Sequence, residues 1–231
     1  MSIPFSPRAA LCTFVVVAGF GTAITAQLPG GLFGLIGMDR EGLLLMEGGG
    51  RAREQDDRDI VTAVLMHEAH RPGRGAVCVR LADEGEALAS ERAEIATLQR
   101  SVEDANPALR AELIAELDRR RNPARSWVRP GPDAVALGDE NQRQLRSAET
   151  SLLVGTSSGR VDITLDMSTL PESLRSTAPN CPALAFTAPA LAGEIAFVET
   201  RFAPPGRAAE ESLYAVVRTD GRWSVEAVAR P

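Results

Sequence analysis

The sequence predicts an α+β protein, with helices and one early strand followed by a C-terminal antiparallel β-meander. Apolar residues recur every three to four positions up to about residue 155, which is typical of helices lying on a core. From about residue 160 apolar and polar residues alternate instead, which is typical of half-buried strands. Because helices and strands are separated along the chain, the pattern favours α+β over α/β.

The first 26 residues have the features of an export signal. Arg8 precedes the apolar run "AALCTFVVVAGFG", and "ITA" ends at Ala26 with a small residue at the cleavage position. A retained membrane anchor is the alternative, although glycines and threonines dilute the stretch and a spanning helix needs about 20 predominantly apolar residues. We therefore expect a periplasmic or secreted protein that meets a membrane only if this segment is kept.

Residues 27–55 are expected to form a flexible stalk, because clustered glycines are followed there by a run of charges. The remainder, residues 56–231, is expected to form a single α+β domain. Within it we expect a helical part at 56–155 and a β-meander at 160–231.

The charge pattern argues against a dedicated nucleic-acid binder. The formal net charge is -6, whereas nucleic-acid binders concentrate positive charge on one face. Every basic residue apart from two histidines is arginine, and alanine is abundant, which indicates a GC-rich bacterial genome. The densest basic run, at 118–125, ends a predicted helix, where arginines favour the negative end of the helix dipole.

Two cysteines, Cys78 and Cys181, remain if the signal is removed, since Cys12 lies within it. In an oxidising compartment they can form one disulfide. Closing a loop of about 100 residues is worth up to about 4–5 kcal/mol in the chain-entropy model. Two separate buried thiols are the alternative, because sequence does not show whether the two side chains meet.

Individual elements follow from apolar stripes, capping residues and alternation. Helices are predicted over 57–70, 86–104, 106–122 and 139–153, with Asn106-Pro107 and Asp139 as start signals. Strands are predicted over 76–82, 160–167, 184–188 and 194–202.

The closing hairpin, "YAVVRTDGRWSV", is the clearest element of all, because Asp220-Gly221 suits a two-residue type I′ turn. In that register Arg218 faces Trp223, Val216 faces Val225 and Tyr214 faces Ala227, all on one side of the sheet. A closing hairpin with a Gly-x-Trp step, over residues 213–225, resembles the ends of nuclear-transport-factor-2-like domains. That resemblance implies a curved sheet backed by helices.

The stretch "LMHEAHRPG", residues 65–73, is close to the zinc-protease signature H-E-x-x-H. Its histidines, His67 and His70, are three residues apart instead of four, which places them about 60° apart around a helix. Glu68 then points toward the apolar face, away from a metal on the histidine side. A catalytic zinc needs a third protein ligand, and nothing in the sequence marks one. We interpret the pair as helix-end histidines and keep His67 and His70 as a candidate metal pair.

Two further motifs do not meet the requirements of their chemistry. "GTSSG" matches G-x-S-x-G around Ser157, but a nucleophile elbow needs a helix after the serine, and the alternating "RVDITLDM" follows instead. Asp162 and Asp166 lie on one predicted strand face about 13 Å apart, whereas glycosidase carboxylates lie about 5–9.5 Å apart. We therefore predict no catalytic residue and no cofactor site.

These observations predict an exported, non-catalytic envelope protein. It would bind an unidentified envelope protein or a small ligand on the meander sheet, and no nucleic acid. One alternative is a metal-assisted hydrolase that uses His67 and His70. The other is a membrane-tethered assembly protein that keeps its N-terminal anchor.

Overall fold

The computed structural model describes residues 40–131, 134–155, 163–178 and 180–229. The chain divides between Arg53 and Glu54, and the architecture below is that of the second unit, residues 54–231. The predicted signal segment lies outside the described residues. No helix in the described ranges combines the length and the hydropathy that crossing a bilayer requires.

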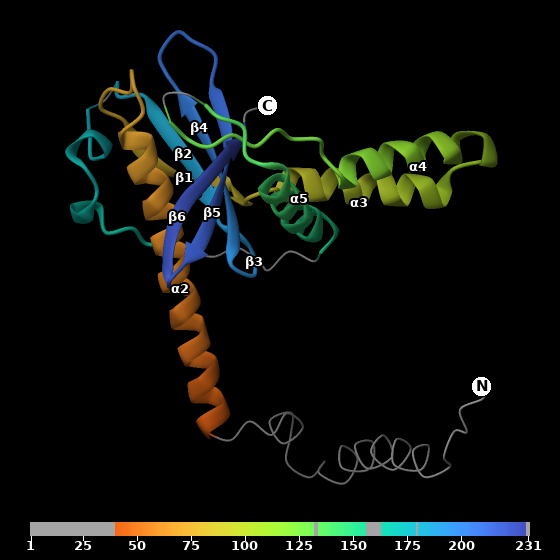
Figure 1. The fold of residues 1–231 in the computed structure, drawn as a ribbon, viewed down its shortest axis with the longest axis horizontal. Helices are drawn as coiled ribbons and strands as arrows, with labels where there is room; N and C mark the ends of the chain where they lie inside the picture. Colours follow the sequence, from red (N-terminus) through yellow and green to blue (C-terminus); the bar gives the residue numbers. More distant parts are fainter. Residues whose placement is uncertain (1–39, 132–133, 156–162, 179, 230–231) are drawn as a thin grey trace. The chain divides into compact units, whose positions relative to one another are not determined.

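The second unit is a mixed sheet with helices on both faces, which confirms the predicted α+β class (Figure 1). The helices are α2 (Arg40–Ala69), α3 (Ala89–Asp104), α4 (Pro107–Arg121) and α5 (Asp139–Val154), with 3-10 turns η1 (Met167–Thr169) and η2 (Glu172–Leu174). The strands are β1 (Cys78–Glu86), β2 (Ala183–Ala188), β3 (Ala190–Ala192), β4 (Ile195–Ala203), β5 (Glu210–Thr219) and β6 (Arg222–Ala229).

The sheet has the strand order β1-β2-β4-β5-β6, and β3 also pairs with β4. Strands β2 to β6 pair antiparallel, as the predicted meander requires. The early strand β1 joins the edge of this meander by pairing parallel with β2. Parallel pairing needs a long crossover, and here the chain between β1 and β2 contains α3, α4 and α5.

Two apolar cores lie on the two faces of the sheet. The first packs α2 against large side chains of the strands, such as Leu184, Val198 and Val216. The second packs α3 and α5, with Trp127, against Phe197 and a set of sheet alanines. Residues at the centre of β4 and β5 are consequently buried on both sides. Both faces of the sheet are therefore covered over these described central strand residues.

The helices differ from the predicted ones mainly at their starts. Helix α2 begins at Arg40, so residues 40–55 of the predicted flexible stalk are helical. That segment has no proline, and its Leu, Glu and Arg residues are good helix formers, although four glycines also lie in it. Helix α3 starts only at Ala89, because β1 continues to Glu86. In α5 the N-cap is Gly138, and Asp139 lies inside the first turn instead of capping it.

The predicted strand at 160–167 is wrong over its described part. Residues 163–166 have no regular structure, and the 3-10 turn η1 follows at once. The carboxylate of Asp166 accepts hydrogen bonds from the backbone N–H of Ser168 at 2.9 Å and from its hydroxyl at 2.6 Å. Such a side-chain bond offers the backbone an alternative to a sheet ladder. The alternation of apolar and polar residues in this segment arises because Ile163 and Leu165 pack against the first core, without strand pairing.

The closing hairpin has the predicted turn and most of the predicted register. Asp220 and Gly221 have φ values of 51° and 74°, as a type I′ turn requires. Arg218 pairs with Trp223 and Val216 pairs with Val225, but Tyr214 pairs with Val228 instead of Ala227. A β-bulge at Ala215/Val216 shifts the register there. The extra residue in β6 is Glu226, and a bulge of this kind carries no clear sequence signal.

Candidate functional site

The last turn of α2 places Glu68 in the core, with its side chain 0% exposed. Glu68 follows Val61, Val64 and Leu65 at helical spacing, so it shares their buried face. The hydroxyl of Tyr214 on β5 donates a hydrogen bond to its Oε1. Arg71 and Arg74 lie 3.2 and 2.8 Å from its two carboxylate oxygens. A buried carboxylate is costly unless it is paired, and these donors compensate it.

Arg71 and Arg74 also connect this cluster to the sheet. Both approach Glu210 at the start of β5, with Arg71 at 3.4 Å and Arg74 at 3.7 Å. The guanidinium of Arg74 also lies 3.6 Å from the ring centroid of Phe202 on β4. Two guanidinium groups thus face two carboxylates, and their formal charges cancel. The cluster fastens the end of α2 to β4 and β5 and carries no excess charge for an ionic ligand.

Burial also decides the protonation of the uncharged members of the cluster. It raises the pKa of Tyr214 above the usual range, and the neighbouring Glu68 carboxylate raises that pKa further. The hydroxyl therefore stays a hydrogen-bond donor at every physiological pH. Burial likewise lowers the pKa of His67, against the opposing effect of Glu68. The neutral imidazole lies edge-on to the Tyr214 ring, with the centroids 5.5 Å apart.

The predicted metal pair does not gain a third ligand in this arrangement. His70 is exposed, and its Nδ1 donates to the carbonyl oxygen of Met66 at 2.7 Å. His67 packs against Tyr214, and Glu68 is held by the donors described above. Within the described ranges, no group of three or more His, Cys, Asp or Glu side chains is arranged to hold a metal ion.

A second buried carboxylate, Glu149 on α5, was missed by sequence reasoning. Arg125 lies 2.5 Å from its Oε1 and also donates to Glu91 on α3. Burial raises the pKa of Glu149 to about 7, although Arg125 acts in the opposite direction. The signal was present in the sequence, because Glu149 stands four residues from both Leu145 and Leu153 in the apolar stripe of α5. This cluster joins α3 to α5.

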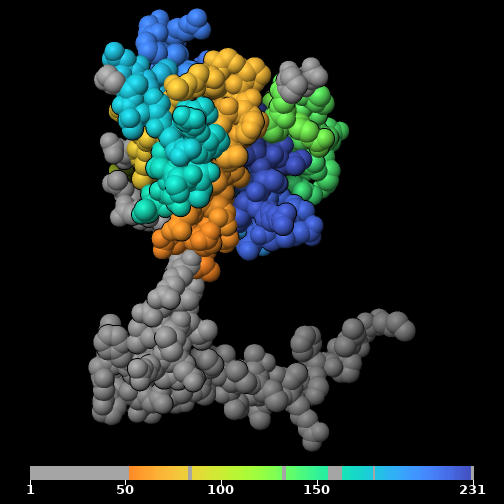
Figure 2. Space-filling model, turned by 90° about the vertical axis from the view of Figure 1, so that its left-hand side faces the viewer, coloured from red at the N-terminus to blue at the C-terminus, as the bar shows by residue number. Residues whose placement is uncertain are grey.

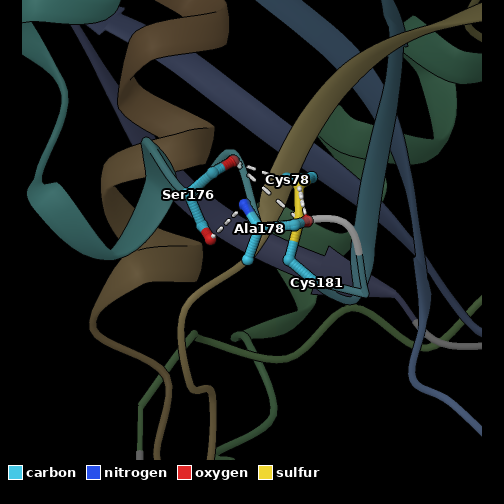
Figure 3. The surroundings of a disulfide bond; sticks show 4 residues. All are labelled: Cys78, Ser176, Ala178 and Cys181. Atoms are coloured by element: carbon cyan, nitrogen blue, oxygen red, sulfur yellow. Dashed lines mark hydrogen bonds between the residues drawn. A yellow bond between two sulfur atoms is a disulfide. The ribbon is translucent and has the colours of Figure 1, made fainter.

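Cys78 and Cys181 are joined in a disulfide, with their Cα atoms 5.7 Å apart (Figure 3). Cys78 is the first residue of β1, and Cys181 lies just before β2. The Sγ of Cys78 also lies 3.1 Å from the carbonyl oxygen of Ser176. The bond closes a separation of 103 residues, which is in the range where chain-entropy stabilisation is largest.

The disulfide secures a segment that we call the strap, residues 163–178 and 180–182. Figure 2 shows its teal and cyan side chains lying across α2. Leu170 and Leu174 of the strap are 3% and 2% exposed and belong to the first core. The disulfide adds a covalent tie to this packing.

The remaining sequence motifs contribute little to a site. Ser157 and Asp162 lie outside the described residues. The carboxylate of Asp166 is engaged by Ser168, whose hydrogen bonds lower its pKa. Asp166 is exposed, as expected, but the predicted strand is wrong there, because residues 163–166 have no regular structure.

The outer face of α4 carries a hollow of about 410 Å³, lined by Leu109, Glu112, Leu113, Glu116 and Arg119. All of these residues belong to one helix, so the hollow is a depression of its surface. Leu109 and Ile114 of the same helix are 53% and 43% exposed. Leu109 borders the hollow, whereas Ile114 does not line it.

Comparison with family models, with curated proteins and with solved structures finds no match to this chain. The likeness of residues 213–225 to one family's closing hairpin therefore stays a local resemblance.

Proposed function

We propose that this chain is an exported protein of the bacterial envelope whose α+β domain binds a partner and catalyses no reaction. The observation that carries the proposal is the Cys78–Cys181 disulfide. Such bonds persist in oxidising compartments such as the periplasm and are rare in the bacterial cytosol. The features of an export signal in residues 1–26 agree with this location.

The two buried carboxylates support a non-catalytic role. A general base must reach the proton that it abstracts, whereas Glu68 and Glu149 have fully buried side chains that face arginines. The proposed partner is another envelope protein or a small ligand. Leu109, which is exposed and lines the hollow on α4, is the side chain that we expect such a partner to contact.

The test of export is a thiol-alkylation experiment in bacterial cells. The full chain is compared with a chain that lacks residues 1–26, and both are trapped with a maleimide that shifts gel mobility. We expect Cys78 and Cys181 of the full chain to react only after reduction, and both thiols of the shortened chain to react directly. The full chain carries Cys12→Ser, so that only these two thiols are counted, and free thiols at Cys78 and Cys181 would contradict the proposal.

N-terminal sequencing of the same exported protein separates the cleaved form from the membrane-tethered assembly protein. A start at or near Gln27 in the soluble fraction supports cleavage. A start at Met1, with the protein in the membrane fraction, supports the tethered alternative.

The competing metal-assisted hydrolase makes a different prediction. A metal-assisted hydrolase must contain bound metal, and a His67→Ala/His70→Ala variant must lose that metal. Elemental analysis of the purified protein decides between them. Stoichiometric zinc or another transition metal that disappears in the variant would replace the non-catalytic proposal.

A further inference from the structure

The ties between the strap and the sheet converge on two neighbouring residues. The N–H of Val77 donates to the carbonyl oxygen of Ser173 at 2.8 Å, and the N–H of Cys78 donates to that of Pro182 at 2.9 Å. Cys78 also forms an isolated β-bridge with Arg175 and the disulfide with Cys181. The backbone of the strap is therefore hydrogen-bonded chiefly to Val77, just before β1, and to Cys78, the first residue of β1.

The rest of the sheet is held together without the strap. Strand β4 pairs with β5 along a continuous register, and β5 pairs with β6 through the tight hairpin. Strand β1 lies at the far edge of the sheet, and Cys78 is its first residue. Proteins open first in segments that lie at edges and have few independent contacts. We therefore expect loss of the disulfide at Cys78 to destabilise the strap before it destabilises the meander.

We infer that the Cys78–Cys181 disulfide is a redox-operated lock, and that its reduction releases the strap from the core while β4, β5 and β6 stay folded. Both cysteines are only half-buried, so a small dithiol can reach the bond. The reductant supplies two electrons and two protons: its two S–H bonds become one S–S bond, while the protein disulfide becomes two thiols. Reoxidation by a disulfide of the same class reverses the step.

Release of the strap has a specific structural consequence. Leu170 and Leu174 leave the first core together with the partly buried Ile163 and Leu165, and the apolar surface beneath them becomes accessible. The oxidised protein hides this apolar surface, and the reduced protein exposes it. The inference concerns the folded domain itself, so it does not depend on whether the chain is exported.

The test is hydrogen–deuterium exchange on the purified full chain, oxidised and then reduced with dithiothreitol. We expect exchange in peptides from 163–178, and at Val77, to rise at least about tenfold on reduction. Peptides from β4, β5 and β6 should keep their protection, and oxidised glutathione should restore the first pattern.

Two variants serve as controls. Cys78→Ser/Cys181→Ser should show the reduced pattern and ignore dithiothreitol, whereas Cys12→Ser should behave as the unaltered chain. Unchanged exchange in the strap after complete reduction would overturn the inference. Loss of protection in β4 to β6 together with the strap would overturn it too, because the bond would then stabilise the whole domain. If the double variant does not fold, the reduction of the unaltered chain still decides the matter.

Discussion

The hydroxyl of Tyr214 on β5 donates a hydrogen bond to the carboxylate of Glu68 in the last turn of α2, and both side chains are buried. The two residues are 146 positions apart in the chain. Their contact links the first described helix to the C-terminal hairpin through the interior. Because both groups are withdrawn from water, the Tyr214 hydroxyl relies on Glu68 as its acceptor, while Glu68 has Tyr214 as a partner in addition to Arg71 and Arg74.

Replacing Tyr214 with Phe keeps the ring and removes the donor. The Glu68 carboxylate then loses one of its buried partners, and we expect the free energy of unfolding to fall by about 1–3 kcal/mol. Urea denaturation measures this change. A double-mutant cycle with Glu68→Leu, which removes the acceptor, isolates the pair, and additive effects of the two substitutions would show that the bond does not couple them.

The stability of the domain should depend on pH through Glu149. Burial raises its pKa from 4.5 to about 7, so the folded state holds its proton more tightly than the unfolded state. The folded domain is therefore favoured below pH 4.5 and loses that advantage as the pH rises through 7. The loss amounts to about 3 kcal/mol at most.

The variant Glu149→Gln should not show this dependence, because the amide does not titrate. Chemical denaturation at pH 5 and pH 8 compares the variant with the unaltered chain. The nearby charged groups Glu91, Arg125 and Arg146 are the same in both proteins. Equal slopes of stability against pH in the two proteins would exclude Glu149 as the source.

Two leucines of α4 should differ in how much stability the domain loses when each is replaced by alanine. Leu117 is 7% exposed, whereas Leu109 is 53% exposed. Leu117→Ala removes buried methyl groups and should cost about 2–5 kcal/mol. Leu109→Ala should change the free energy of unfolding by less than about 0.5 kcal/mol. A similar decrease in the unfolding temperature of both variants would mean that the Leu109 side chain is buried in solution, by another part of the chain or by a second molecule.

The closing turn depends on glycine at position 221. Gly221 has φ of +74° and no atom within 4 Å of an added Cβ, so the strain of a substitution comes from the backbone alone. Gly221→Ala should destabilise the domain by about 1–2 kcal/mol. Gly75→Ala is the matched control, since Gly75 has equal space and no left-handed φ. A neutral Gly221→Ala variant would argue against the type I′ turn.

Much of the fold is readable from local patterns. Asn106 caps α4 with its side chain, and Asp220-Gly221 forms the expected turn, because both act through neighbouring atoms. Periodicity also places Glu68 on the buried face of its helix correctly. The prediction at 160–167 failed because alternation reports which side chains pack inward and does not report whether the backbone pairs. The three-residue histidine spacing excluded the zinc-protease signature, but it could not reveal Tyr214 as the partner of Glu68.

The α+β class, the succession of most elements and the geometry of the closing turn follow from interactions within a few residues, so they can be predicted from the amino-acid sequence. Long-range packing is what buries Leu117 and exposes Leu109, moves Tyr214 opposite Val228 through a bulge, and brings Cys78 to Cys181. These outcomes depend on which distant segments come together. Many residues of similar pattern can compete for such contacts, and the packing of the whole domain selects among them.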